Sequence, residues 1–412
     1  MNTDIIRETS SVCPVCMDEL DAFIIKRDGA AYLEKTCPSH GEFSILVSES
    51  SQDYQELKDS YFGLVPEGLP QKEYYLHAVQ RCNLSCPMCF LDFKKNGGEL
   101  TPEAVKLIAK TEKIKRFTFS HSEATTCDHL LDLVRILKNF KKIVNIHTNG
   151  LKLADDQFAF SLKSAGIDHV SLQFDGFDES VYERLRNRRL LAVKLKALRN
   201  LKRLSIPVTL NVTVAKGVNE NEIGRIFDYG IRERFIKDIS FITYSNYDPH
   251  QVRMDRYIMP DELLKYLEAH SQGRISRQNV LLFQKLFYAY AGLFKKRKCF
   301  YYYHFLVVRT RRGYRTIDEF IDLQKIGSGL DAIKRKKRRP GYFSFFLMLV
   351  SAVRIKKIVP LFSAIPLLFK GGFPDKPSRF LTITFATICD PYKYNWALHI
   401  TIARYRKFLA KV

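Results

Sequence analysis

The stretch Arg81-Cys82-Asn83-Leu84-Ser85-Cys86-Pro87-Met88-Cys89-Phe90 decides how this sequence is interpreted. Its cysteines follow the spacing C-x3-C-x2-C, so one short loop supplies three thiolates. Three thiolates can bind three irons of a 4Fe-4S cubane and leave the fourth iron without a protein ligand. The alternatives are buried free thiols or a zinc site, but zinc takes four ligands and no fourth one is spaced for it. The spacing therefore indicates a cluster with one iron open to a small molecule.

Around this loop, strand-like runs alternate with amphipathic helical runs. The expected strands are Tyr74–Val79, Arg116–Ser120, Ile143–His147, His169–Phe174, Val208–Val214 and Ile239–Tyr244. The expected helices span 102–112, 128–140, 155–165, 179–203 and 220–232. Repeated β-α units imply a parallel sheet with helices outside, so the predicted fold class is α/β, a partial (β/α)6 TIM-like barrel. Chemistry in such barrels gathers at the carboxyl ends of the strands, where the cysteine loop falls.

The cysteine triplet, together with Arg81, Asn83 and Phe90, resembles the radical SAM superfamily. The resemblance implies a barrel of the radical SAM type. It also implies that the amino and carboxylate groups of S-adenosyl-L-methionine (SAM) occupy the open iron. An electron from the cluster then breaks the sulfonium and releases a 5'-deoxyadenosyl radical. A reducing donor such as ferredoxin or flavodoxin is the implied electron source.

The same resemblance assigns SAM contacts at the loop and at three strand ends. Ser120–Thr125 stands where the superfamily carries a Gly-Gly-Glu-Pro motif; the glutamate is retained as Glu123, while both glycines and the proline are replaced. His147–Gly150 and Leu172–Gly176 end the next two strands. The residues expected to bind SAM are therefore Phe90, Glu123, Asn149, Gln173 and Asp175, with the last two suited to the ribose hydroxyls.

A second metal site is predicted near the amino terminus. Cys13, Cys16, Cys37 and His40 follow the spacing C-x2-C-x20-C-x2-H, which favours one tetrahedral ion, either zinc or a rubredoxin-like iron. Short strands on both sides of the Asp28-Gly29 turn would join the two halves into a ribbon. So few apolar residues lie here that a bound metal would supply the stability, and its role would be structural or that of an electron relay.

Charge and hydropathy divide the chain into three expected parts. Residues 1–70 are assigned to the metal ribbon and a linker, 71–260 to the radical SAM core, and 261–412 to a mainly helical, substrate- or membrane-associating region. This last region holds 30 of the 66 Lys and Arg residues but 9 of the 44 acidic ones. Such a surface attracts the phosphate of anionic lipid or of nucleic acid.

Two apolar runs favour anionic lipid over nucleic acid as the partner of this basic region. Phe343–Val353 and Ile358–Phe369 lie beside the basic runs 334–339 and 354–357. Neither run approaches the roughly 20 residues that span a bilayer. They favour an in-plane anchor on an anionic membrane, with buried helices flanked by solvated charge as the alternative and nucleic acid as the weaker partner.

Several motifs together resemble one branch, the archaeal tetraether lipid synthase family. They are the CPxC and CPxHG knuckles, the RCNLxCPxCF loop, the LQFDG strand end, and Lys216–Gly224. The resemblance implies radical C-H chemistry on a membrane lipid alkyl chain. That branch binds further clusters through additional cysteines, of which only Cys299 and Cys389 have counterparts here, so a simpler abstraction, methylation or desaturation is expected. Cys127 is expected to be a small core residue.

The sequence also allows two alternative functions, one that keeps the radical chemistry and one that keeps only metal binding and membrane association. One moves the radical chemistry to RNA or a peptide, with the basic region as a phosphate-binding surface. The other is a metal-binding membrane adaptor that has lost SAM cleavage. Met1–Arg7 has no apolar run of a secretory signal, and the clustered thiols indicate a reducing compartment, so the expected location is cytoplasmic, on the inner face of the membrane.

Overall fold

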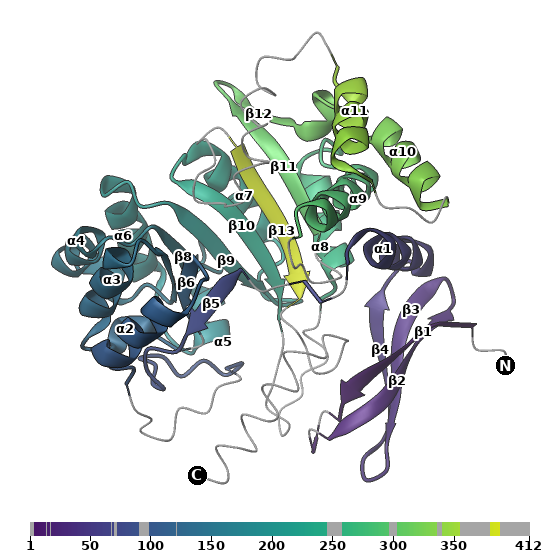
Figure 1. Cartoon of the computed structure of the whole chain (residues 1–412). Coiled ribbons are helices and arrows are strands. Elements are labelled where there is room, and N and C mark those ends of the chain that lie inside the picture. The colour runs from purple at the N-terminus through teal and green to yellow at the C-terminus, as the bar shows by residue number, and fades with distance from the viewer. Residues whose placement is uncertain are drawn as a thin grey trace.

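The computed structural model describes residues 4–13, 15–16, 18–66, 68–69, 72–89, 99–120, 122–244, 258–295, 303–335, 340–354 and 380–387. Two β-sheets organise these residues, a small antiparallel sheet at the amino terminus and a large, mostly parallel one (Figure 1). Phe90, Cys299, Cys389, the basic residues 336–339 and the apolar run 358–369 lie outside the described residues.

The small sheet is the predicted ribbon, with two more strands than the sequence indicated. Its strands run in the order β1-β2-β3-β4 and are β1 (Asp4–Val12), β2 (Glu19–Arg27), β3 (Ala30–Cys37) and β4 (Gly41–Ser48). The turn between β2 and β3 places Asp28 at φ 49° and Gly29 at φ 77°. An Asp-Gly pair accommodates these positive angles, which match the twist of a hairpin.

A helix, α1 (Ser51–Leu64), occupies most of the expected linker. Ser50 caps it by accepting a hydrogen bond from the Asp53 amide. Tyr54, Leu57 and Leu64 are buried on one side, so helical spacing of apolar residues joins this segment to the core.

The large sheet has the strand order β12-β11-β13-β10-β9-β8-β7-β6-β5. Its first six strands along the chain are parallel and lie close to the predicted ones: β5 (Glu73–Leu76), β6 (Arg116–Phe119), β7 (Ile143–Thr148), β8 (His169–Gln173), β9 (Val208–Val214) and β10 (Ile236–Thr243). The α/β class with a parallel sheet is confirmed.

The helices between these strands are α2 (Pro102–Thr111), α3 (Leu130–Asn139), α4 (Asp156–Ala165), α5 (Glu179–Arg186), α6 (Leu191–Arg203) and α7 (Glu222–Arg232), with short 3-10 turns η1 (Ala124–Thr126) and η2 (Lys152–Ala154). The prediction of one helix over 179–203 was wrong. Asn187 ends α5 in the left-handed region at φ 55° and separates it from α6. Asparagine tolerates this conformation, so no glycine or proline marks the break.

The sheet continues into the region beyond residue 260. Strand β13 (Phe380–Thr387) pairs in parallel with β10, and β11 (Tyr303–Thr310) and β12 (Gly313–Thr316) follow as antiparallel strands. The remaining helical elements are α8 (Pro260–His270), α9 (Arg277–Leu293), η4 (Ile317–Glu319), α10 (Leu323–Arg335) and α11 (Tyr342–Ala352). Figure 1 shows α10 and α11 at the edge of the molecule beyond β11.

The two faces of the large sheet differ in chemistry. One face is apolar and packs into the main core: Val144, Ile146, Val170, Leu172, Leu210, Val212, Ile239, Phe241, Ile383 and Phe385. Side chains alternate between faces, so the residues between them share the opposite face. Those residues are polar in two registered rows, His147-Ser171-Thr209-Asp238-Thr382 and Gln173-Asn211-Ser240-Thr384-His304. We call these ten residues the polar wall.

Candidate active site and metal centre

The cysteine loop begins directly after β5 and is fixed from two sides. The carbonyl of Arg81 accepts a hydrogen bond from the amide of Glu123 at 3.2 Å, which joins the loop to the end of β6. Met88 is buried against Val181 and Leu185 of α5. The loop therefore lies at the carboxyl ends of the parallel strands, where the sequence placed it.

Asn149 links the loop to the end of β7. Its side-chain nitrogen donates to Asn83 Oδ1 at 2.7 Å and lies 3.8 Å from Cys82 Sγ. The following Gly150 has φ +78°, and a Cβ there would come within 2.3 Å of Leu172 Cδ1. A glycine is therefore required for the chain to bring Asn149 to the cysteines.

Glu123 is buried and directs its carboxylate into the protein. Its oxygens accept hydrogen bonds from the backbone and hydroxyl of Thr125, from Thr148 Oγ1 at 2.7 Å, and from the Asn149 amide at 2.7 Å. The carboxylate thus joins the ends of β6 and β7. In this arrangement Glu123 positions the backbone of Asn149, and its direct contact with SAM stays a prediction.

Asp175 is fully buried and pairs with Arg186, which the sequence analysis did not single out. Arg186 Nε and Nη2 donate to the two oxygens of Asp175 at 2.8 and 3.0 Å, and Nη2 also donates to Thr213 Oγ1 at 3.0 Å. Burial alone would lower the pKa of Arg186, but the carboxylate of Asp175 raises it above its ordinary value, with a further contribution from a hydrogen bond to Cys86. A permanent positive charge therefore lies beside a cluster cysteine.

Lys194 is a second buried cation that the sequence analysis missed. Its ammonium donates to the carbonyl of Gln173 at 2.9 Å and, closely, to the Asn149 carbonyl and to Gln173 Oε1. Burial lowers the pKa of Lys194 to about 7, partly opposed by Asp175. The side chain of Gln173 also donates to Asp175, so Gln173 and Asp175 belong to one internal network.

The sequence contained a signal for Lys194. Leu198 and Leu201, at positions i+4 and i+7 from it, are buried on the same side of α6. A lysine where the helical period calls for an apolar residue is a candidate buried cation. Arg186 carried no comparable signal, because α5 ends in two arginines and only the fold shows that Arg184 is exposed and Arg186 buried.

The three loop cysteines fit a cluster. All three are free thiols, half-buried on one loop. Burial, together with the nearby charges of Glu123, Cys86 and Cys89, raises the pKa of Cys82 to about 11. Three thiolates close to a carboxylate repel one another unless a cation lies between them. The irons of a cubane would supply that positive charge.

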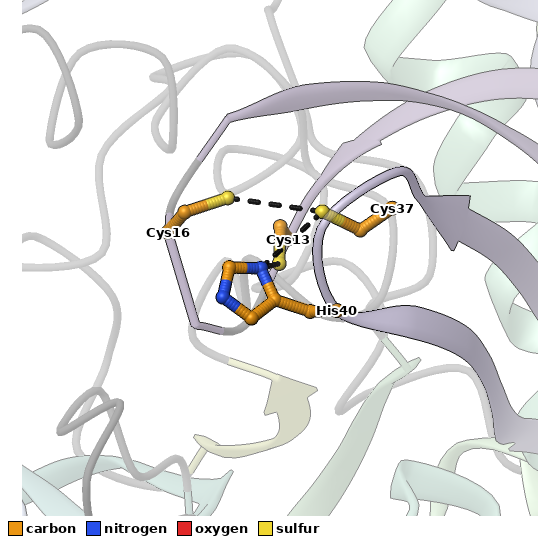
Figure 2. A group of neighbouring side chains, drawn as sticks. All are labelled: Cys13, Cys16, Cys37 and His40. Carbon is orange, nitrogen blue, oxygen red and sulfur yellow. Dashed lines mark hydrogen bonds between the residues drawn. The ribbon is translucent and has the colours of Figure 1, made fainter.

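The amino-terminal group is the second metal centre, and Figure 2 shows its four side chains converging between the ends of the ribbon strands. His40 Nδ1 lies 3.5 Å from Cys13 Sγ and 3.4 Å from Cys37 Sγ, while Cys16 Sγ lies 3.8 Å from Cys37 Sγ. All four ligand atoms lie within 4.8 Å of one another. A tetrahedral zinc ion with ordinary bond lengths requires about 3.8 Å between sulfurs and about 3.6 Å between sulfur and nitrogen.

The pKa values of two ligands of this centre move in opposite directions, and burial raises that of Cys16 to about 12. Burial would raise the pKa of Cys37, but hydrogen bonds from His40 and from the backbone of Ser39 lower it to about 6. Thiolate is the form that binds metal. Among the described residues, this is the only group of Cys, His, Asp and Glu whose ligand atoms lie that close together.

Two family models match the chain. Residues 77–230 match the radical SAM superfamily, and residues 5–49 match the HMPTM N-terminal zinc ribbon domain. The 7,8-dihydro-6-hydroxymethylpterin dimethyltransferase of Methanocaldococcus jannaschii is 28% identical over 305 residues, which is 66% of this chain and 60% of that protein. The probable GTP 3',8-cyclase of Pyrococcus horikoshii is 30% identical over 160 residues, 38% of this chain and 51% of that protein. The chain thus spans between half and two thirds of these relatives.

Solved structures are similar at lower identity. Streptococcus suis SuiB bound to precursor peptide SuiA aligns with 55% of this chain and 50% of its own, at 18% identity and a TM-score of 0.42.

With its parallel strands and cysteine loop, the chain contains a radical SAM domain over residues 77–230. More particularly, it joins an HMPTM-type zinc ribbon to a radical SAM core. The 4Fe-4S cluster, SAM and a metal at the amino-terminal site are confirmed as its cofactors. Within the part of the chain that the structure describes, no helix has the length and hydropathy to cross a membrane.

Proposed function

We propose that this chain cleaves SAM reductively and uses the resulting radical to abstract a hydrogen atom from a C-H bond of a polar organic substrate. A bound 4Fe-4S cluster would supply the electron that converts SAM to methionine and a 5'-deoxyadenosyl radical, which becomes 5'-deoxyadenosine on taking the hydrogen. The observation that carries the proposal is the contact of Asn149 with the cysteine loop at the carboxyl ends of the strands, where its side-chain nitrogen lies 3.8 Å from Cys82 Sγ and 2.7 Å from Asn83 Oδ1. An external one-electron donor is required.

The polar wall supports a substrate with hydrogen-bonding groups. Thr209, Asn211 and Ser240 are half-buried in neighbouring strands, and His304 Nδ1 lies 3.1 Å from Thr384 Oγ1 farther along the same face. Thr209, His304 and Thr384 have hydrogen-bond partners within the protein, but an alkyl chain laid on this face would cover Asn211 and Ser240 without offering them a partner. Each group left unpaired costs about 1–3 kcal/mol. A substrate with its own donors and acceptors avoids that cost.

The relative in Methanocaldococcus jannaschii supports a more specific choice. Its name gives a reduced pterin as the molecule it dimethylates, and its similarity covers 66% of this chain. A pterin ring carries several donors and acceptors in one plane, as the polar wall requires. We therefore propose a reduced pterin or a similar nitrogen heterocycle as the substrate class.

The test is anaerobic turnover of the reconstituted protein with dithionite and SAM. We expect 5'-deoxyadenosine to form faster when 7,8-dihydro-6-hydroxymethylpterin is added. Cys86→Ala should abolish cluster absorbance and turnover, whereas Cys127→Ala should retain both, because Cys127 is buried against Glu99 outside the loop. Full turnover by Cys86→Ala would overturn the radical proposal.

A wall variant tests the substrate class separately. Asn211→Leu should lower the stimulation by the pterin at least about tenfold, since one lost polar contact of about 1.4 kcal/mol has that effect. Leu107→Asn, an exposed change on α2, is the control. If the pterin stimulates Asn211→Leu and the parent protein equally, the polar wall does not bind the substrate.

A membrane lipid alkyl chain is the second candidate substrate. The exposed apolar face of α11, described below, favours it because it would hold the enzyme at a bilayer. In the same turnover assay, lipid vesicles would then stimulate 5'-deoxyadenosine formation and the pterin would not. The peripheral membrane location expected from the sequence agrees with this substrate but does not require it.

A further inference from the structure

Helix α11 exposes an apolar face that no described part of the chain covers. Five large side chains are about half or more exposed: Tyr342 (62%), Phe343 (74%), Phe346 (51%), Leu347 (49%) and Val350 (53%). Their spacing of i, i+1, i+4, i+5 and i+8 places them on one side of the helix. The other side holds the helix in place, with Phe345 and Ala352 buried.

Several contacts keep this face outward. The Tyr342 hydroxyl donates to the Leu293 carbonyl at 3.0 Å, and the Asp322 amide donates to the Ala352 carbonyl at 2.8 Å. Lys325 Nζ donates to the Ser351 carbonyl at 2.8 Å. Both ends of α11 are thus tied to neighbouring elements, so the five side chains cannot turn inward without breaking these bonds. Contiguous exposed apolar patches of this kind mark interaction sites.

Positive charge brackets the helix. Lys334 and the exposed Arg335 end α10, directly before α11 in the chain, and the sequence stays basic through residue 339. Arg354 is exposed one residue beyond the C-cap, and Lys356 and Lys357 follow in the sequence. The helix itself contains no charged residue. An apolar face between two groups of cations complements a surface that is apolar inside and anionic at its rim.

We propose that α11 docks in the plane of an anionic lipid bilayer, with its five exposed side chains in the acyl boundary and Lys334, Arg335 and Arg354 at the lipid phosphates. The helix has 11 residues and is therefore about 17 Å long, too short for the roughly 30 Å hydrocarbon core. A second copy of the chain would place two groups of cations together, and RNA would leave the apolar face in water. A bilayer satisfies both features. The proposal concerns where the enzyme is held and does not depend on its substrate.

Flotation of the full chain with lipid vesicles tests this surface. We expect it to float with vesicles of phosphatidylcholine and phosphatidylglycerol, less with phosphatidylcholine alone, and less as salt increases. The double variant Phe343→Ser/Phe346→Ser should lower the partition coefficient at least tenfold, because two exposed phenyl groups no longer enter the acyl region. Both side chains point outward, so the variant should fold normally.

The matched control is Leu107→Ser/Phe160→Ser, which removes two equally exposed apolar side chains from α2 and α4. It should bind vesicles like the parent protein. Equal binding by the α11 variant and the control would overturn the proposal. A second outcome would also overturn it: the parent protein does not bind vesicles, sedimentation shows that it forms dimers, and the α11 variant does not form them. Formation of 5'-deoxyadenosine in detergent-free buffer, measured in parallel, reports on the radical chemistry alone.

Discussion

Arg186 holds the buried carboxylate of Asp175 through two parallel hydrogen bonds of 2.8 and 3.0 Å, and Cys86 is among the groups that raise the pKa of the same guanidinium. Asp175 also accepts from the Thr213 amide at 3.1 Å. The pair therefore joins the end of β8 to α5 and β9 and places a positive charge beside the cluster loop.

Breaking this pair on one side should destabilise the protein. Arg186→Leu leaves the Asp175 carboxylate buried and unpaired, and we expect a loss of about 3–5 kcal/mol in the free energy of unfolding. Asp175→Asn/Arg186→Leu should recover a large part of it, because no uncompensated charge remains. Urea denaturation followed by circular dichroism measures both; a double variant as unstable as the single one would contradict a charge effect.

The same arginine should influence the cluster. A cation near a cluster thiolate stabilises the reduced, more negative state, so Arg186→Gln should lower the midpoint potential. Arg184→Gln changes an exposed arginine two residues earlier on the same helix and serves as the control. A redox titration monitored by EPR compares the two variants. An unchanged potential in Arg186→Gln, with the cluster intact, would show that the charge is too far away or screened.

Lys194 should make stability depend on pH. Burial lowers its pKa from 10.5 to about 7 in the folded chain. Between these two values the unfolded chain binds more protons than the folded chain, so the free energy of unfolding should rise with pH, by at most about 1.4 kcal/mol per pH unit. Lys194→Met should remove this rise. The measurement is the denaturation midpoint of both apo proteins at several pH values between pH 7 and 10. If the midpoints of the parent protein and of Lys194→Met change with pH in the same way, the prediction is wrong.

The ribbon should depend on its ion. Cys37→Ala removes one of four ligands, and we expect the loss of one equivalent of zinc or iron and a thermal midpoint lower by several degrees. Cys127→Ala, a buried cysteine far from the ribbon in sequence, should keep the ion. Elemental analysis of both variants decides this, and it also identifies the metal. Retention of the ion by Cys37→Ala would rule out the proposed ligand set.

Local patterns predicted most of the parallel sheet. The run Val208–Val214 was placed correctly because alternating β-branched residues specify a strand by themselves. The membership of β11 and β13 in the same sheet was not predictable, since the pairing of Tyr303 with Phe385 joins residues far apart in the chain. The metal ligands could be found from spacing, which is a local property. The Asp175-Arg186 pair could not, because it depends on where α5 packs.

The substrate was the hardest property to predict from the sequence, because it also depends on residues that are far apart in the chain. Motifs around Cys82 and Asp175 indicate the radical chemistry, but the substrate meets side chains from many strands. Ser240 and Thr384 face the same side of the sheet only because β10 and β13 pair in register. Sequence resemblance to a lipid-modifying branch does not contain that information.

The carboxylate of Asp261, in the first turn of α8, is fully buried and accepts hydrogen bonds from Ser48 Oγ and the Glu49 amide, both at 2.8 Å. Ser48 ends β4, the strand that follows His40 in the ribbon. Losing the ribbon's ion would therefore loosen a strand whose last residues hold α8, a helix that packs against β10 and β13 of the large sheet. Melting by calorimetry should accordingly proceed as one event, and chelation should depress the temperature at which the whole enzyme unfolds.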